Sequence, residues 1–253
     1  MTQMVEPLLR KPLKWTYGVT TVPERFNGLL PRTLSSLYKA GFGSPRLFID
    51  GCDPKCAHDY QLTYPLLEIS SRYPTIRPFG NWALALAELY IRDPHADRYA
   101  IFQDDILAVS NLREYLENID YPGSTVNRPG YWNLCTYPHN AALAPDTNGW
   151  FISNQKGLGA QGLVFNHEAV MLMLKHKNFV DRPMDPNRGW RRIDGGVVNT
   201  MAAVGWVEYV HKPSLIDHTG LQSSMANPRQ PRINTFPGQA FDARTLLGDN
   251  YAS

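Results

Sequence analysis

Short apolar segments rich in β-branched and aromatic residues recur along this chain, separated by amphipathic segments. The short segments predict strands at residues 15–21, 46–50, 98–102, 131–136, 162–165 and 206–210. Apolar residues at helical spacing predict helices at 30–40, 82–91, 111–117, 167–176 and 193–204. Asn81, Ser110 and Asn166 are the expected helix caps. Residues 53–78 follow neither pattern, and 211–220 are expected to form a loop.

Strands that alternate with helices predict an α/β fold, an open and largely parallel sheet with helices on both faces. Residues 1–225 are expected to form one domain, and the polar residues 226–253, with three prolines, a C-terminal arm. Ligands of such sheets bind at the carboxyl ends of strands. The loops after Thr21, Asp50 and Phe102 are therefore expected to share one rim.

Composition narrows the class of protein. The chain has 253 residues, 43% of them hydrophobic, which excludes a disordered protein. Its 25 basic and 23 acidic residues give a net charge of +2, which neither requires nor excludes a nucleic-acid partner. Three cysteines, Cys52, Cys56 and Cys135, do not form a disulfide framework or a zinc motif. No signal peptide or membrane span is recognisable, so we expect a cytoplasmic protein without a membrane partner.

The sharpest chemical signal is the acidic pair Asp104-Asp105, which directly follows an apolar strand. Adjacent carboxylates repel each other, and a divalent cation such as Mg²⁺ or Mn²⁺ relieves that repulsion. The alternative is a pair of solvated loop residues or helix caps. The strand immediately before the pair favours a functional role.

Two later segments add candidate groups. His218 lies in a loop that is rich in hydroxyl side chains, and a neutral imidazole is a good metal ligand. Asp194 stands at the start of a helix, followed by Gly195 and Gly196. It is either a helix cap or a carboxylate that acts as a general base, with the glycines leaving room for a substrate.

Taken together, these segments resemble the GT-A glycosyltransferases, which use nucleotide-activated sugars and have a Rossmann-like, mixed, mostly parallel sheet. Gln103-Asp104-Asp105 resembles a variant of the family's Asp-x-Asp metal motif, with Gln at its first position. By this resemblance, Asp105 and His218 are metal ligands for Mn²⁺ or Mg²⁺. Asp104 contacts the ribose or the metal, and Asp194 deprotonates the acceptor in an inverting reaction.

The resemblance also implies a donor site for a UDP-sugar on the same rim. Arg25 can neutralise a diphosphate, Asp50 can bind the base or ribose, and Gln161 belongs to a glycine-rich loop that can line a sugar pocket. The alternatives are a surface arginine for Arg25, a turn carboxylate for Asp50 and a plain helix cap for Asn81. The donor-site candidates are Thr20, Thr21, Pro23, Arg25, Asp50, Asn81, Gln103, Asp104, Gln161 and Ser223.

The acceptor is suggested by basic residues beside Asp194. Trp190, Arg191 and Arg192 are the acceptor-site candidates, with further arginines at 182, 188, 229 and 232. They are compatible with a polyanion. The chain is similar to small bacteriophage GT-A proteins that glycosylate hydroxymethylated pyrimidines in double-stranded DNA, which would place it in the host cytoplasm. Ordinary surface ion pairs are the favoured explanation of the arginines, and a bacterial glycan, a lipid-linked sugar or a small molecule fits equally well as the acceptor.

Two other function classes stay open at the level of sequence. A nucleotidyltransferase shares the α/β sheet, the paired carboxylates and the metal, but usually has a glycine-rich loop after the first strand, which residues 21–25 lack. A non-catalytic nucleotide-binding module would use Asp104 and Asp105 only as caps. The expected activity is the transfer of a hexose from a UDP-sugar to a hydroxyl group.

Overall fold

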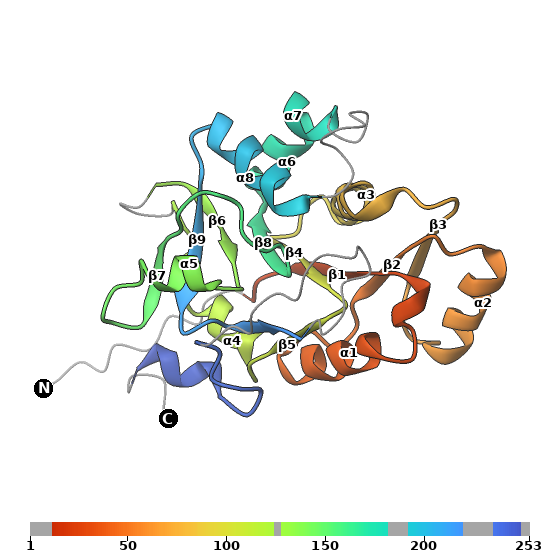
Figure 1. Ribbon diagram of the computed structural model, residues 1–253, viewed down its shortest axis with the longest axis horizontal. Helices are drawn as coiled ribbons and strands as arrows, with labels where there is room; N and C mark the ends of the chain where they lie inside the picture. Colours follow the sequence, from red (N-terminus) through yellow and green to blue (C-terminus); the bar gives the residue numbers. More distant parts are fainter. Residues whose placement is uncertain (1–11, 124–127, 182–191, 220–234, 249–253) are drawn as a thin grey trace, which may run out of the picture.

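A computed structural model describes residues 12–123, 128–181, 192–219 and 235–248. Eight strands form one sheet in the order β3-β2-β1-β4-β8-β6-β9-β7, and two more form a small antiparallel sheet (Figure 1). The large sheet comprises β1 (Trp15–Thr21), β2 (Arg46–Asp50), β3 (Ile69–Arg72), β4 (Arg98–Gln103), β6 (Gly130–Asn133), β7 (Gly149–Ile152), β8 (Gly162–Asn166) and β9 (Val207–Lys212). The small sheet pairs β5 (Ile106–Ala108) with β10 (Ile216–His218).

The direction of the strands makes the sheet mixed. Strands β3, β2, β1 and β4 are mutually parallel, as are β6 and β9. Strand β8 runs antiparallel to both β4 and β6, and β7 runs antiparallel to β9. The predicted α/β fold, with a mixed and mostly parallel sheet flanked by helices, is therefore confirmed.

Helices cover both faces of the large sheet (Figure 1). One core unites α3, α6 and α8 with one face, and a second unites α1 and α4 with the other. None of the helices in the described ranges is long and apolar enough to cross a membrane. The helices are α1 (Leu29–Lys39), α2 (Pro54–Thr63), α3 (Arg77–Arg92), α4 (Leu112–Glu117), α5 (Pro138–Ala141), α6 (His167–Lys175), α7 (Lys177–Val180) and α8 (Ile193–Ala203).

Helices α1 and α6 form where their sequence patterns predict them. In α1, Leu30 and Leu37 are completely buried against the sheet, as their spacing on one helical face requires. Asn166 caps α6, because its side-chain oxygen accepts the backbone N–H of Ala169 at 2.8 Å.

Two expected caps are wrong. Helix α3 begins at Arg77, so Asn81 lies inside the helix, where its amide donates to the Phe48 carbonyl at 3.0 Å. The residue before α4 is Asn111, in a left-handed conformation, whereas the Ser110 hydroxyl donates to the Gln239 carbonyl. In both cases a contact with a distant segment uses the side chain that local sequence assigned to a cap.

Several elements were not predicted from the sequence: the short elements β5, α5, β7 and α7, and further elements in two longer stretches. Residues 53–78 contain α2, capped by Asp53, and the edge strand β3. Only Tyr60 is buried in α2, so this helix lacks the apolar stripe that makes a helix visible in sequence. The expected loop at 211–220 contains β10, which forms because β5 offers it a pairing partner.

The described part of the C-terminal segment packs on the main body beside α4. Ala243 is completely buried, and the backbone N–H groups of Ser110 and Ala243 bond to the carbonyls of Phe241 and Ser110. The short 3₁₀ helix η3 (Ala243–Leu247) follows. The domain boundary after residue 225 stays a prediction. The three cysteines are free thiols.

Candidate active site

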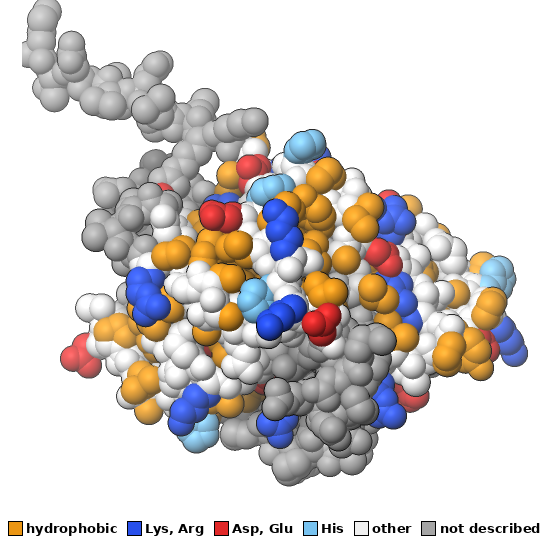
Figure 2. Space-filling model, turned by 90° about the horizontal axis from the view of Figure 1, so that it is seen from above, with side chains coloured by type: hydrophobic (Ala, Val, Ile, Leu, Met, Phe, Trp, Pro, Cys, Tyr) orange, Lys and Arg blue, Asp and Glu red, His pale blue; other side chains and the backbone are white. Residues whose placement is uncertain are grey.

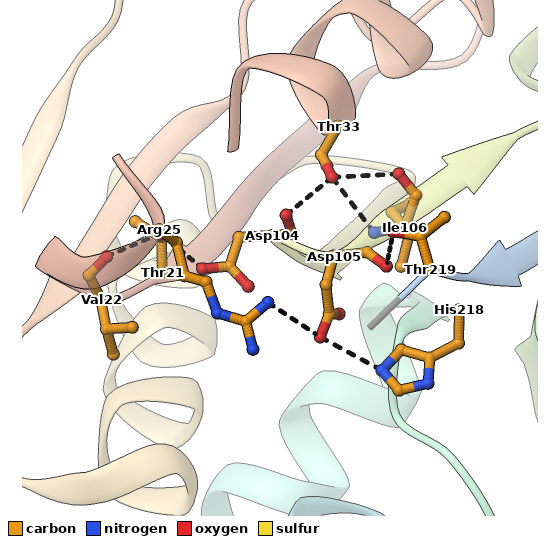
Figure 3. Close-up of polar contacts among 9 residues, drawn as sticks. All are labelled: Thr21, Val22, Arg25, Thr33, Asp104, Asp105, Ile106, His218 and Thr219. Atoms are coloured by element: carbon orange, nitrogen blue, oxygen red, sulfur yellow. Dashed lines mark hydrogen bonds and ion pairs between the residues drawn. The ribbon is translucent and has the colours of Figure 1, made fainter. Parts of the chain in front are cut away.

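Strand β4 ends in an acidic turn, which α1 holds in place. Asp104 and Asp105 form this turn between β4 and β5, and each is only 7% exposed. The Thr33 hydroxyl of α1 lies 2.8 Å from the Asp104 carbonyl oxygen and accepts the Ile106 N–H at 3.1 Å (Figure 3). The turn is thus fixed by a side chain that the sequence analysis did not single out.

Replacing Thr33 by valine should lower the free energy of unfolding by about 1–3 kcal/mol, because it leaves a buried N–H and a buried carbonyl without their partner. Urea denaturation measures this loss. Thr33→Ser keeps the hydroxyl and should retain more of the stability than the valine variant. A valine variant as stable as the wild type would show that the Thr33 hydroxyl does not hold the acidic turn.

The two carboxylates of the turn have different surroundings. The Thr21 hydroxyl at the end of β1 donates to Asp104 at 2.6 Å. Burial, and then the charge of Asp105, raise the pKa of Asp104 to about 6. A carboxyl group in this position is easily neutralised unless a cation lies close by.

Asp105 meets two basic groups that come from distant parts of the chain. Its Oδ2 atom lies 3.1 Å from His218 Nε2 and 3.5 Å from Arg25 Nη1 (Figure 3). The pairing of β10 with β5 places His218 opposite Ile106, and the Thr219 N–H bonds to the Asp105 carbonyl at 2.8 Å. Residues 113 positions apart in sequence therefore share one point at the carboxyl edge of the sheet.

This donor set fits a divalent cation that also binds a substrate. Among the described residues, the buried Asp105 Oδ1 atom has no hydrogen-bond partner. A carboxylate oxygen and an imidazole nitrogen side by side would suit a divalent transition-metal ion such as Mn²⁺. The described residues hold no cluster of three or more His, Cys, Asp or Glu that would bind a metal by themselves. Phosphate oxygens and water would have to complete the coordination.

Asp194 lies in the first turn of α8, after the cap position. Its Oδ1 accepts the Gly195 N–H at 2.8 Å and its Oδ2 accepts the Gly159 N–H at 3.1 Å. Arg192, not Asp194, occupies the cap position. The glycine-rich loop before β8 is thus the direct neighbour of Asp194, a connection that the sequence did not reveal.

Tyr137, which the sequence pattern did not single out, lies beside the glycine-rich loop. Its ring lies so close to Gly159 that a Cβ atom there would come within 2.3 Å of it. Burial raises the pKa of Tyr137, and Cys135, Asp105 and Asp194 raise it further. Its position just after the end of β6 could have signalled this location.

Gln161 lies in the same region. Its backbone carbonyl accepts the Gln103 N–H at 2.8 Å, which joins the glycine-rich loop to the end of β4. Among the described residues, its side-chain oxygen is buried without a hydrogen-bond partner. A polar group of this kind is suited to a ligand hydroxyl.

Other candidate residues have contacts within the fold. Both oxygens of Asp50 are engaged, by the Thr75 hydroxyl and the Ile76 N–H, each at 2.7 Å. The Thr20 hydroxyl donates to the Phe102 carbonyl at 3.3 Å. Pro23 lies in the 3₁₀ turn η1 (Pro23–Arg25), next to the site. Arg192 is exposed, and the candidates Trp190, Arg191 and Ser223 lie outside the described residues.

No protein-family model matches this chain, and no curated protein matches it. Similar solved structures include a crystal structure of GalNAc-T7 with UDP, GalNAc and Mn²⁺, with 12% identity and a TM-score of 0.47, over 79% of this chain and 44% of that one. Mannose-1-phosphate geranyltransferase from Thermus thermophilus has 12% identity and a TM-score of 0.46, over 79% of this chain and 74% of that one. This chain spans less than half the length of GalNAc-T7. At such identity the likeness concerns the fold alone.

Proposed function

We propose that this protein is a metal-dependent glycosyltransferase that moves a hexose from a UDP-sugar to a hydroxyl acceptor with inversion. The observation that carries the proposal is the meeting of Asp105, His218 and Arg25 at the carboxyl edge of the sheet. One carboxylate, one imidazole and one guanidinium at this edge suit a diphosphate with its divalent cation.

The donor would lie across the ends of β1 and β4. Asp105 and His218 would hold the cation, which as a Lewis acid neutralises the negative charge of the departing UDP. Arg25 is 9% exposed and can pair with a phosphate oxygen. Thr21 and Asp104, joined by their 2.6 Å hydrogen bond, would face the ribose, and Gln161 and Tyr137 the sugar.

Asp194 would take the proton of the acceptor hydroxyl. The Gly159 and Gly195 N–H groups orient its carboxylate, so the base does not depend on a mobile side chain. As the bond to UDP breaks, the acceptor oxygen attacks the opposite side of the anomeric carbon, and Asp194 receives its proton. A single displacement of this kind inverts the configuration.

The candidate acceptors remain those that the sequence suggested, namely hydroxymethylated bases in DNA, a glycan, a lipid-linked sugar or a small molecule. Figure 2 views the molecule from above, where the described basic and acidic side chains are scattered among apolar ones. This face offers no continuous basic patch among the residues that the structure describes. Mass spectrometry of reactions with hydroxymethylated and unmodified DNA would identify a DNA acceptor by the mass of the added hexose.

Binding of UDP with Mn²⁺ tests the proposed function directly. We expect UDP to raise the melting temperature only when Mn²⁺ is present, by an amount equivalent to about 2.7 kcal/mol at 100 times the Kd. Asp105→Asn should abolish this metal-dependent shift. Glu24→Gln, an exposed acid next to Arg25, serves as the matched control and should keep it.

Two results would contradict the proposal. The proposal would be contradicted if UDP raised the melting temperature equally with and without Mn²⁺, or equally in the wild type and in Asp105→Asn. Either result would show that UDP binds without a metal held by Asp105. The absence of a shift with any nucleotide would favour a non-catalytic module instead.

A further inference from the structure

A buried acid, Glu208, anchors the loop that holds Asp194. Glu208 lies on β9 and is 1% exposed. Its Oε1 atom accepts hydrogen bonds from the Tyr131 hydroxyl and the Asn133 amide, both at 3.1 Å. Burying a carboxyl group costs free energy of folding. We therefore look for its role in the neighbouring groups that its hydrogen bonds hold in place.

Asn133 connects Glu208 to the loop formed by residues 153–161. The same amide that bonds to Glu208 also donates to the Gly159 carbonyl at 2.8 Å. Asn133 is completely buried, and its oxygen accepts the Cys135 N–H at 3.1 Å. Because every polar atom of its side chain is engaged, a shift of the Glu208 carboxyl would be passed on to Gly159.

The backbone of Glu208 holds a second point of the same loop. The side-chain amide of Gln155 donates to the Glu208 carbonyl at 3.0 Å, and its oxygen accepts the Glu208 N–H at 3.1 Å. The Ser153 N–H also donates to the Glu208 carbonyl, at 3.0 Å. The loop is therefore attached to β9 through both the side chain and the backbone of one residue.

The other side of the loop is shaped around Asp194. The Gly159 N–H donates to Asp194 Oδ2 at 3.1 Å. At Gly157, whose φ is +65°, a Cβ atom would come within 2.8 Å of the Asp194 carbonyl oxygen. Only glycine fits there without strain, so this loop and the first turn of α8 are in close contact.

We propose that Glu208, acting through Asn133 and residues 153–161, is a positioning residue for the Asp194 carboxylate. The inference rests on the proposed function, because it gives Asp194 the role of base. A displacement of about 1 Å in a reacting group can cost about 100-fold in rate. Loss of the anchor should therefore lower the rate of the chemical step without changing the UDP- and metal-binding groups at the ends of β1 and β4.

Release of UDP from a panel of UDP-hexoses, together with hydrogen–deuterium exchange, tests this role. In Glu208→Ala we expect kcat to fall about 10–100-fold, while the affinity for UDP with Mn²⁺, which Asp105, His218 and Arg25 would bind outside this loop, changes less than about twofold. Deuterium uptake should rise in residues 153–161 and in the first turn of α8. Glu208→Gln can keep both hydrogen bonds to Oε1 and should restore kcat and protection.

Tyr99→Phe provides the matched control, since it removes a hydrogen bond of a buried tyrosine, the one to the Asp93 carbonyl at 2.8 Å, that involves neither Glu208 nor the loop. It should leave kcat and loop protection unchanged. If Glu208→Ala does not fold, Gln155→Ala removes the two bonds to the Glu208 backbone outside the core and should produce a smaller change of the same kind.

Unchanged kcat and exchange in both Glu208→Ala and Gln155→Ala would overturn the positioning role. So would a parallel loss of kcat and of the affinity for UDP with Mn²⁺ that Glu208→Gln fails to restore. If the wild type releases no UDP from any UDP-hexose, the proposed function fails, and exchange at the first turn of α8 still decides whether Glu208 holds Asp194.

Discussion

Asp194→Asn should lower the turnover of the UDP-sugar by about 100- to 10,000-fold, the usual contribution of a general base. Asparagine has nearly the same shape, and its one acceptor oxygen can still accept the Gly159 N–H while the bond from the Gly195 N–H is lost, so the contact between the loop and α8 should remain. What the variant loses is the ability to take a proton from the acceptor hydroxyl. Binding of UDP with Mn²⁺ should remain nearly unchanged, because Asp105 and His218 are intact.

Steady-state kinetics and the UDP-dependent melting shift, measured on the same preparation, test this expectation. Glu168→Gln is a suitable control, because Glu168 is another carboxylate in the first turn of a helix, exposed on α6. Its turnover should match the wild type. Full turnover in Asp194→Asn would show that Asp194 only ties α8 to the glycine-rich loop.

The second large effect concerns stability and pH. Burial raises the pKa of Glu208 from 4.5 to about 7. Between these two values the unfolded chain releases this proton while the folded protein keeps it. Glu208 therefore stabilises the fold at low pH, and its contribution falls as pH rises from about 4.5 to about 7. The loss amounts to about 3 kcal/mol.

Other groups titrate in the same range. Asp104, whose pKa is raised to about 6, changes stability in the same direction as Glu208. Burial lowers the pKa of His211 to about 4, so its contribution runs the opposite way: it is present above about 6.5 and is lost as pH falls. The pH dependence of the wild-type free energy of unfolding therefore combines several groups and does not give the contribution of Glu208 by itself.

A comparison with Glu208→Gln isolates that share. The free energy of unfolding of the wild type, relative to the variant, should fall by about 3 kcal/mol between pH 4.5 and 7.5. Urea denaturation at a series of pH values gives both curves. Parallel curves would mean that Glu208 titrates alike in the folded and unfolded chain, contrary to its burial.

Local pattern was sufficient for much of the fold. The segment Trp15–Thr21 and the apolar run before Asp104 could be assigned as strands, because β-branched and aromatic residues favour a pleated, buried surface. Helix α1 was visible through its stripe of leucines. Helix α2 and strand β3 were not, since α2 buries only Tyr60 and β3 lies at an edge of the sheet.

The residues of the candidate site also fall into two groups, those that the sequence could identify and those that it could not. Asp104, Asp105 and Asp194 could be selected by residue type and by position after a strand or at the start of a helix. Asn133 and Glu208 could not, because nothing in their local sequence distinguishes them from ordinary residues of buried strands. Their significance comes from neighbours that lie 20 or more positions away.

By itself, the sequence determined the alternation of strands and helices and the placing of acids at strand and helix ends, because these depend on contacts between near neighbours in the chain. Only the tertiary structure decided that His218 meets Asp105 and that Glu208 supports Asp194. Those contacts require β10 to pair with β5, and β9 with β6, and such pairing depends on the packing of the whole sheet.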